Sequence, residues 1–300
     1  MLCSSNSLIS GEALYQWRLW AQADAQKAKI SAYEVDWFLQ GVSNLSQLDL
    51  RLGLYQNWTT VSLRHSLDWL THQWQRRLSE RVPVQYLVGE TPWRDLMLTV
   101  TSDVLIPRPE TELVVDIVMA WVEQQQQIPK PVVWADLGTG SGAIAIVLAK
   151  AFPHSQVLAV DISAAALEIA RQNAQRNQVA NIEFFQSRWF DRLGAWQGKL
   201  SGVITNPPYI PSQVVLTLEP EVTNHEPHQA LDGGNDGLND IRLLVEQAPN
   251  FLQPGGLWLT EHMQGQAHSI ATLLEAQAVY KTIQVHRDLA GIERFVSASI

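Results

Sequence analysis

From Pro131 onward the chain alternates short apolar runs with amphipathic stretches, and no other feature restricts its fold as strongly. An apolar run of about 4–8 residues is typical of a buried strand. Strands that alternate with helices predict a parallel sheet covered on both faces. The predicted strands are Val132–Ala135, Gln156–Val160, Ile182–Phe185, Leu200–Thr205, Leu257–Thr260, Thr282–His286 and Arg294–Ala298, and one predicted helix is Ser163–Arg176, with Ser163 as N-cap.

The last two predicted strands are joined only by the segment from Asp288 to Ile292. A parallel crossover needs about a dozen residues or more, so the seventh strand is expected to be antiparallel. The sequence therefore predicts an α/β fold with a seven-stranded, Rossmann-like sheet whose last strand is antiparallel. One connection, from Asn206 to about Asn239, is long and has little regular pattern, which is typical of a functional segment.

The N-terminal part of the chain has helical spacing, shown by Leu67, Leu70, Trp74 and Leu78, and the pair Ser31 and Glu34 predicts a capping box. Further on, Tyr86–Gly89 and the alternating Leu96, Leu98 and Val100 predict two short strands. A helix is expected over Thr111–Glu123, before a polar loop, Gln124–Gln127. We predict a helical docking domain over residues 1–84, a β-hairpin linker over 85–106 and a larger domain over 107–300. The six tryptophans of the helical part could equally fill a small core.

The tetrapeptide Asn206-Pro207-Pro208-Tyr209 follows the predicted strand Leu200–Thr205, so it is expected at a strand's carboxyl end, where open α/β sheets bind ligands. Its prolines fix two φ angles and remove two backbone donors. The Asn206 amide oxygen and a backbone carbonyl could each accept one N–H of a planar NH2 group, while the Tyr209 ring stacks on it. Taken alone, the tetrapeptide is better explained as a turn, so its meaning depends on the other motifs.

A glycine-rich segment, Gly138-Thr139-Gly140-Ser141-Gly142, connects the first predicted strand to a helix. Glycines there let the backbone turn tightly and approach a ligand. Asp161, at the end of the next strand, is placed to hydrogen-bond a ribose diol. These residues predict a ribose-bearing cofactor without distinguishing a dinucleotide from a methyl donor. Since Asn206–Tyr209 offers no proton donor or acceptor for hydride transfer, the combined motifs resemble the class I S-adenosylmethionine-dependent methyltransferases that modify planar amino groups.

The charge balance disfavours a nucleic-acid substrate. The formal net charge is −9, with +1 over residues 1–85 and −10 over the remainder. Nucleic-acid binders need a basic footprint, although a local basic patch could still exist. No apolar run reaches membrane-spanning length, and Met1 to Ser10 lacks the features of a secretory signal. With Cys3 as the lone cysteine, a reduced cytoplasmic setting is expected.

The long connection also carries acids and histidines: Glu219, Glu221, His225, Glu226 and His228. No helix is expected there to fix ligand geometry, so no metal is predicted. Asp232, Asp236 and Asp240 do not fit a calcium loop and are predicted turn formers. Arg76 and Arg77 are expected on a solvated helix face, whereas Arg108 is either functional or paired with an acid.

Three further segments resemble the glutamine N5-methyltransferases that act on peptide-chain release factors. They are Val104–Glu112 (VLIPRPETE), Glu226–Leu231 (EPHQAL) followed by Gly233-Gly234-x-x-Gly237-Leu238, and Arg81–Gly89 (RVPVQYLVG). The similarity runs from about residue 80 to the end, and the helical front matches in kind. This resemblance implies a methyltransferase sheet, S-adenosylmethionine as cofactor and the glutamine of a release factor's Gly-Gly-Gln loop as acceptor, with no direct nucleic-acid or membrane partner.

By this resemblance Gly138 to Gly142 line the methionine and ribose of the cofactor, Asp161 holds the ribose hydroxyls and Trp189 flanks the adenine. Asn206 touches both cofactor and substrate, and Pro207, Pro208 and Tyr209 complete the amide clamp. Asn206, Pro207 and Tyr209 are the implied catalytic residues. Two residues depart from the family pattern: Trp93 replaces a usual Phe, and Met263, within Glu261–Gly265, replaces an expected Gly.

Two other functions remain open at this point. An N6-adenine or N2-guanine nucleic-acid methyltransferase also clamps a flat NH2 group, but it would need a basic recognition region. A non-catalytic adaptor would use only the helical front, and the glycine loop, Asp161 and Asn206 argue against it. The sequence does not identify the group that receives the proton, or the preferred release factor.

Overall fold

The computed structural model describes residues 7–125 and 131–300, and the predictions that concern Cys3, Met1 to Asn6 and Gln126–Gln127 lie outside them. The chain forms two compact units. The first contains Met1–Glu90 and Glu219–His225, and the second contains Thr91–Leu218 and Glu226–Ile300. Among the described residues, no helix has the length and hydropathy needed to cross a membrane.

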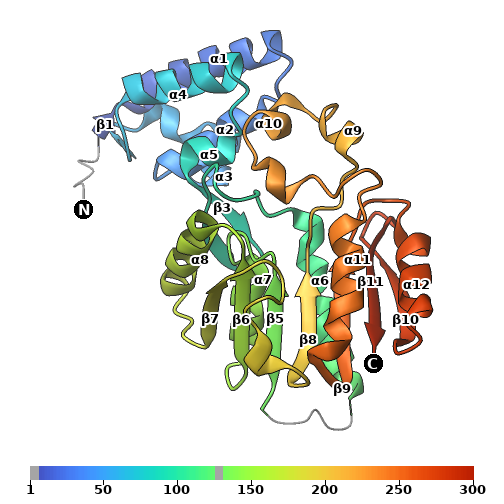
Figure 1. Cartoon of the computed structure of the whole chain (residues 1–300). Helices are drawn as coiled ribbons and strands as arrows, with labels where there is room; N and C mark the ends of the chain where they lie inside the picture. The colour runs from blue at the N-terminus through green and yellow to red at the C-terminus, as the bar shows by residue number, and fades with distance from the viewer. Residues whose placement is uncertain (1–6, 126–130) are drawn as a thin grey trace. The chain divides into compact units, whose positions relative to one another are not determined.

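The second unit is built on a seven-stranded sheet, seen in Figure 1 as a row of arrows from β7 to β10. Its strand order is β10-β11-β9-β8-β5-β6-β7. The strands are β5 (Val133–Leu137), β6 (Gln156–Asp161), β7 (Ile182–Gln186), β8 (Leu200–Thr205), β9 (Leu252–Glu261), β10 (Lys281–Arg287) and β11 (Glu293–Ser299).

Strand directions confirm the predicted sheet. β5 pairs in parallel with β6 and β8, β6 with β7, and β8 with β9. β11 runs antiparallel to both β9 and β10, as its short connection requires. The bounds of Leu200–Thr205 were predicted correctly, but β5 ends at Leu137 and β9 begins at Leu252, so both are longer than predicted.

Two hydrophobic clusters lie on opposite faces of this sheet, because neighbouring side chains on a strand point to opposite faces. Val133 and Ala135 of β5 belong to one cluster, and Trp134 between them belongs to the other.

The helices of the second unit, with the short 3-10 turns η2 to η5, are η2 (Pro109–Glu112), α6 (Leu113–Gln124), α7 (Ala143–Ala151), α8 (Ala164–Arg176), η3 (Gly194–Trp196), α9 (Ser212–Val215), η4 (His228–Ala230), α11 (Asn239–Gln247), η5 (Ala248–Asn250) and α12 (Ala267–Ala276). α6, α7 and α8 contribute to the Trp134 cluster, and α11 and α12 to the other.

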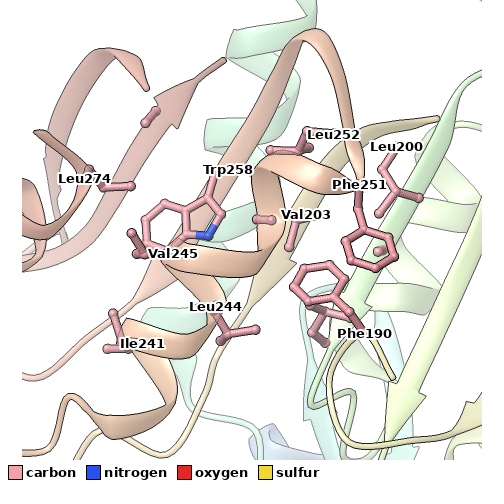
Figure 2. Packing of buried hydrophobic residues seen from close by; sticks show 14 of the residues in the cluster. Phe190, Leu200, Val203, Ile241, Leu244, Val245, Phe251, Leu252, Trp258 and Leu274 are labelled. Carbon is pink, nitrogen blue, oxygen red and sulfur yellow. The ribbon is translucent and has the colours of Figure 1, made fainter. Parts of the chain in front are cut away.

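The cluster against α11 and α12 has an aromatic centre, which Figure 2 shows. Phe190 and Phe251 stack with ring centroids 4.4 Å apart. Trp258 of β9 is fully buried beside Val245 of α11. This packing holds α11 against β8 and β9, the two strands whose ends carry Asn206 and Glu261.

The first unit is helical, with a short pair of strands. Its elements are β1 (Ser7–Ile9), α1 (Gly11–Lys27), α2 (Tyr33–Val42), α3 (Gln47–Leu52), η1 (Leu54–Asn57), β2 (Val61–Leu63), α4 (Leu67–Ser79), α5 (Val84–Val88) and α10 (Pro220–Thr223), the last belonging to the long connection. The helical spacing of Leu67 to Leu78 is confirmed by α4. Trp17 and Trp74 are buried in the core of this unit, so these tryptophans have a packing role.

Two predictions about this unit are wrong. No side chain caps α2, because Glu34 pairs with Arg77 instead of closing a capping box with Ser31. Arg77 is not on a solvated face: its side chain is 4% exposed and contacts Glu34 and Glu221. Arg76, one residue earlier, is 39% exposed and pairs with Glu80 on the same helix.

The predicted hairpin exists but is shorter than expected. β3 (Glu90–Trp93) and β4 (Leu96–Thr99) form a two-stranded sheet. The strand predicted at Tyr86–Gly89 is wrong, because Val84–Val88 forms the helix α5. Val84 and Leu87 are buried and share one face of it, and Gly89 ends it in the left-handed conformation that glycine adopts at low cost.

Candidate active site

The candidate site lies at the carboxyl ends of the parallel strands. From the central strand β5 the chain order runs to β6 on one side and to β8 on the other. Such a switch point opens a crevice between neighbouring loops. A cavity of about 470 Å³ is found there, lined by Ser102–Leu105, Pro107, Arg108, Thr111, Gly138–Ser141, Ala143, Ile144, Asp161–Ser163, Ala166, Ser187–Trp189, Asn206, Pro208, Pro227, Gln229, Ala230 and Asp240.

Most of the predicted site residues meet in this cavity, but three do not line it. Gly138, Thr139, Gly140, Ser141, Asp161, Trp189, Asn206 and Pro208 all line it. Gly142 instead packs under the loop, where a Cβ would lie 3.1 Å from Ala170 of α8. Pro207 is buried, and Tyr209 is partly buried against the cluster that contains Trp258.

The glycine loop between β5 and α7 is held from below by Asp136. Oδ2 of Asp136 accepts hydrogen bonds from Thr139 Oγ1, at 2.6 Å, and from the backbone nitrogen of Ala145, at 3.0 Å. Burial raises the pKa of Asp136 to about 7. Gly138, Gly140 and Gly142 all have positive φ, which allows the loop to follow this path.

Asp161, the last residue of β6, lies against that loop and also lines the cavity. Its Oδ2 accepts from the backbone nitrogen of Gly140 and its Oδ1 from that of Ser163, both at 2.9 Å. Burial raises the pKa of Asp161, and the backbone donors oppose the rise. Ser163 caps α8 as predicted, by accepting from the nitrogen of Ala166.

Trp189 forms another wall of the cavity. Its indole nitrogen donates to Oδ1 of Asp240 on α11 at 2.9 Å, which fixes the orientation of the ring. Asp240 is therefore an indole acceptor and not the predicted turn former. Asp232 and Asp236 do form turns, because each accepts from the backbone nitrogen two residues further on, in Gly234 and Leu238.

The tetrapeptide Asn206–Tyr209 follows β8 directly. Nδ2 of Asn206 donates to Thr111 Oγ1 of η2 at 3.4 Å. Within the described ranges, Oδ1 of Asn206 and the carbonyl of Pro207 accept no hydrogen bond from the protein. Both oxygens therefore lack a hydrogen-bond donor among the described residues.

The hydroxyl of Tyr209 donates to Glu261 Oε1, at 3.0 Å, rather than pointing into the cavity. Glu261 is the last residue of β9 and is 2% exposed. Burial raises the pKa of Glu261 to about 7, and the hydroxyls of Thr111 and Tyr209 oppose that rise.

The segment Gly233–Leu238 packs against Tyr209 and Ile210, at the end of the tetrapeptide. The carbonyl of Ile210 accepts from the nitrogen of Gly233, and the nitrogen of Ile210 donates to Leu231. A Cβ on Gly237 would lie 2.2 Å from the carbonyl oxygen of Tyr209, so only glycine fits there. Gln266 Nε2 also donates to that carbonyl, at 2.9 Å.

An ion pair between Arg108 and Glu226 joins the segments Val104–Glu112 and Glu226–Leu231 beside the cavity. Arg108 donates to Oε1 of Glu226 at 2.7 Å, and Oε2 of Glu226 accepts from the nitrogen of Ile106 at 3.4 Å. The indole of Trp93 donates to the carbonyl of Arg108 at 2.9 Å. Arg108 therefore has the acidic partner that the sequence suggested, and Glu226 is used as that partner.

Three residues of the site escaped sequence reasoning: Thr111, Glu261 and Asn173. Asn173 of α8 is fully buried and donates to the carbonyls of Ser141 and Thr99, linking the glycine loop to β4. Thr111 and Glu261 lie in two segments of the family resemblance, Val104–Glu112 and Glu261–Gly265. Only the fold shows that they meet beside Asn206 and Tyr209.

Comparison with known proteins identifies the family. A release factor glutamine methyltransferase of Synechocystis sp. is 47% identical over 98% of this chain and 98% of its own length. The chain belongs to the release factor glutamine methyltransferase family. A second member, from Thermosynechococcus vestitus, is 45% identical over 97% of this chain and 99% of its own. A family model described as the methyltransferase small domain matches residues 121–225.

Solved structures agree on the fold of this release factor glutamine methyltransferase family member. The hMettl16 catalytic domain, solved in complex with a MAT2A 3′UTR hairpin, aligns with a TM-score of 0.55 over 89% of this chain and 91% of that one. The identity is 13%, so this likeness shows a methyltransferase fold and nothing of the substrate.

Proposed function

We propose that this enzyme transfers a methyl group from S-adenosylmethionine to the side-chain amide nitrogen of the glutamine in the Gly-Gly-Gln loop of a peptide-chain release factor. Apart from family membership, one observation in the site supports an amide as the methyl acceptor. Two oxygens at the end of β8, Oδ1 of Asn206 and the carbonyl of Pro207, have no hydrogen-bond donor in the described chain. A primary amide offers two N–H groups to such a pair of acceptors.

The cavity fits the proposed cofactor in its chemistry. Asp161 offers a carboxylate to ribose hydroxyls, Trp189 offers an aromatic face to an adenine ring, and the Gly138–Ser141 backbone borders the space between them. When bound, S-adenosylmethionine would supply a methyl group on a positively charged sulfur. The acid Asp161 and the polar Asn206 both suit a cationic, ribose-bearing ligand.

The role of the tetrapeptide is to position a poor nucleophile. The lone pair of an amide nitrogen is delocalised into its carbonyl, so it attacks only when well oriented. Oδ1 of Asn206 and the Pro207 carbonyl would hold both N–H groups, and Tyr209 and Pro208 would flank the amide plane. These acceptors also stabilise the positive charge that develops on nitrogen as the new C–N bond forms. The nitrogen becomes acidic at that stage, and its proton leaves to solvent or a nearby acceptor.

We also propose that the first unit, residues 1 to about 84, binds the release factor away from its glutamine. Binding energy from such a remote contact can be used to hold the acceptor loop in place. The negative charge of the remainder of the chain suits an acceptor loop that itself works near RNA.

Mass spectrometry tests the proposed function. The purified enzyme, labelled S-adenosylmethionine and a release factor should give a factor with one added methyl group on the glutamine of its Gly-Gly-Gln loop. A factor with that glutamine replaced should remain unlabelled. Asn206→Ala should fold but lose roughly 10²–10³ in kcat, the scale for removing one transition-state hydrogen-bond partner. Methylation of DNA or RNA in place of the factor would contradict the proposal.

A further inference from the structure

Asp240 of α11 has one carboxylate oxygen that the proposed function leaves without a task. Oδ1 accepts from the indole nitrogen of Trp189 at 2.9 Å, and the Arg188 guanidinium lies 3.7 Å from the same oxygen. Within the described ranges, Oδ2 accepts no hydrogen bond from the protein. The Asp240 side chain is 19% exposed and the residue lines the cavity, so Oδ2 is available to a donor on a bound ligand.

Trp189 is held at two edges of its ring. The indole nitrogen donates to Asp240, and a Cβ on Gly138 would lie 3.4 Å from Cζ3 of the six-membered ring. The backbone of Trp189 has a φ of 46°, in the left-handed region that bulky residues rarely adopt. Such conformations persist where the surrounding structure enforces them, and they cluster at ligand sites. Trp189 is therefore a fixed wall of the cavity, with Asp240 beyond the edge that carries its nitrogen.

This wall lies next to the carboxylate that would bind a ribose. β6 and β7 pair with Asp161 opposite Gln186, so Ile162 and Trp189 follow two neighbouring strand ends. Both residues line the cavity, and Ile162 is exposed. A ribose held at Asp161 would bring its base to these two apolar side chains, one of which offers an aromatic face for stacking. One edge of that base would then face Asp240.

The chemistry of Asp240 restricts what this edge of the base carries. An ionised carboxylate only accepts hydrogen bonds, so it selects a base with a donor. Adenine has such a donor in its 6-amino group, whereas hypoxanthine has a carbonyl oxygen at the same position. Ser187 also lines the cavity, but its hydroxyl already donates to the carbonyl of Arg188 and accepts from the nitrogen of Arg192. The guanidinium of Arg188 is a donor and cannot accept from an amino group.

We propose that Asp240 recognises the 6-amino group of the adenine of S-adenosylmethionine through Oδ2, while Oδ1 orients the ring of Trp189 on which the adenine stacks. Asp240 is thus a specificity-determining residue for the cofactor. This inference rests on the cofactor of the proposed function and extends it to the base. A ligand with hypoxanthine in place of adenine should be rejected.

Calorimetry with two product analogues tests the inference on the full-length enzyme. S-Adenosylhomocysteine and S-inosylhomocysteine differ only in the purine, which is hypoxanthine in the second. The wild type should bind S-inosylhomocysteine at least tenfold more weakly, because a site that hydrogen-bonds a ligand group rejects an analogue that lacks it. Asp240→Asn keeps an acceptor for the Trp189 indole but places an amide N–H where Oδ2 was. Its preference for S-adenosylhomocysteine should therefore disappear or reverse.

Measuring both ligands with both proteins isolates the contact between Asp240 and position 6 of the purine. Differences elsewhere on the purine affect the two proteins equally and cancel in the comparison. Asp191→Asn is the matched control, because Asp191 is exposed and does not line the cavity, and it should keep the wild-type preference. If Asp240 served only to orient Trp189, Asp240→Asn would also keep that preference, and this result would overturn the inference.

The α-ammonium of the cofactor is a second donor that could reach a carboxylate. 5′-Methylthioadenosine retains the adenine and lacks the amino acid, so it separates the two contacts. Asp240→Asn should weaken S-adenosylhomocysteine and 5′-methylthioadenosine by the same factor, about tenfold, the scale of one hydrogen bond to a charged group. A loss that is present with S-adenosylhomocysteine and absent with 5′-methylthioadenosine would assign Asp240 to the ammonium and overturn its assignment to the base.

The outcomes separate this inference from the proposed function. A wild-type enzyme that methylates the glutamine but binds the two homocysteine derivatives equally overturns the inference alone, and this result does not depend on any variant folding. An enzyme that prefers S-adenosylhomocysteine in the wild type, loses the preference in Asp240→Asn and leaves the glutamine unmodified supports the inference and overturns the proposed acceptor. An enzyme that binds neither S-adenosylmethionine nor S-adenosylhomocysteine overturns both.

Discussion

Asp161 has two tasks at the residue scale. Its carboxylate already accepts from the nitrogens of Gly140 and Ser163, and it borders the cavity where a ribose would lie. We predict that Asp161→Ala weakens cofactor binding at least tenfold, since each charge-assisted hydrogen bond to a hydroxyl contributes about 1.5–3 kcal/mol. Calorimetry with S-adenosylmethionine measures this loss. The affinity for the acceptor peptide should change little, and an unaltered cofactor affinity would show that the carboxylate only holds the loop.

Glu261 also has a consequence for stability at this scale. Burial raises its folded-state pKa to about 7, above the usual 4.5. Between these values the folded state keeps a proton that the unfolded state has lost, so the free energy of unfolding decreases as pH rises toward 7. We predict that Glu261→Gln removes this decrease and is more stable than wild type above pH 7.

Urea unfolding at about pH 5 and pH 8 measures that difference. Glu275→Gln is the matched control, because Glu275 lies on the exposed side of α12 and should leave the wild-type pH dependence intact. Equal stability of Glu261→Gln and wild type at both pH values would mean that Glu261 is not desolvated as the structure shows.

At the scale of elements, Arg77 joins three helices of the first unit. Its guanidinium bonds Glu34 of α2 at 2.6 Å and Glu221 of α10 at 2.8 Å, and its side chain is 4% exposed. We predict that Arg77→Ala lowers the free energy of unfolding by about 3 kcal/mol, because removing one member of a buried ion pair leaves its partner uncompensated. Arg76→Ala, on the same helix, should cost under about 0.5 kcal/mol, since its pair with Glu80 is exposed.

Denaturation followed by tryptophan fluorescence distinguishes these two variants. Equal stability of Arg77→Ala and Arg76→Ala would mean that water solvates the carboxylates of Glu34 and Glu221 when Arg77 is absent. The ion pairs of Arg77 would then contribute little to the free energy of unfolding.

The elements also show which parts of the molecule a sequence can predict. The strand Leu200–Thr205 is predicted correctly because its apolar residues, Leu200, Val203 and Ile204, lie close together just before Asn206-Pro207. Tyr86–Gly89 was assigned to a strand, since a short apolar run has the same appearance in a buried helix turn. Glu34 was assigned to a capping box, but its partner is Arg77, 43 positions away. Pairings over such separations leave no local pattern.

The same reasoning applies to the site. The glycine loop, Asp161 and Asn206 could be placed from the sequence, because each follows a strand and parallel strands bring their carboxyl ends together. Glu261 ends a strand too, but the sequence does not show that Tyr209 donates to it or that Thr111 contacts Asn206. Those contacts depend on the register of β8 and β9 and on the path of the chain through η2.

At the scale of the whole molecule, the proposed docking role of the first unit is open to a direct test. Leu48 and Leu52 lie one helical turn apart on α3, and they are 58% and 59% exposed. Two exposed leucines on one helix face suit contact with a protein partner more than with solvent. We predict that the double change Leu48→Ser and Leu52→Ser raises KM for the intact release factor at least fivefold, a typical loss of about 1 kcal/mol for interface side chains.

The KM for a short peptide with the same glutamine should stay unchanged, because a peptide lacks the surface that the first unit would bind. Leu289→Ser is the matched control: this leucine is 95% exposed in the turn between β10 and β11 of the second unit, and its replacement should affect neither substrate. A parallel rise in both KM values would place the effect in the catalytic site. Wild-type values for both substrates would exclude this face of α3 from docking and leave recognition to the second unit or another face of the first.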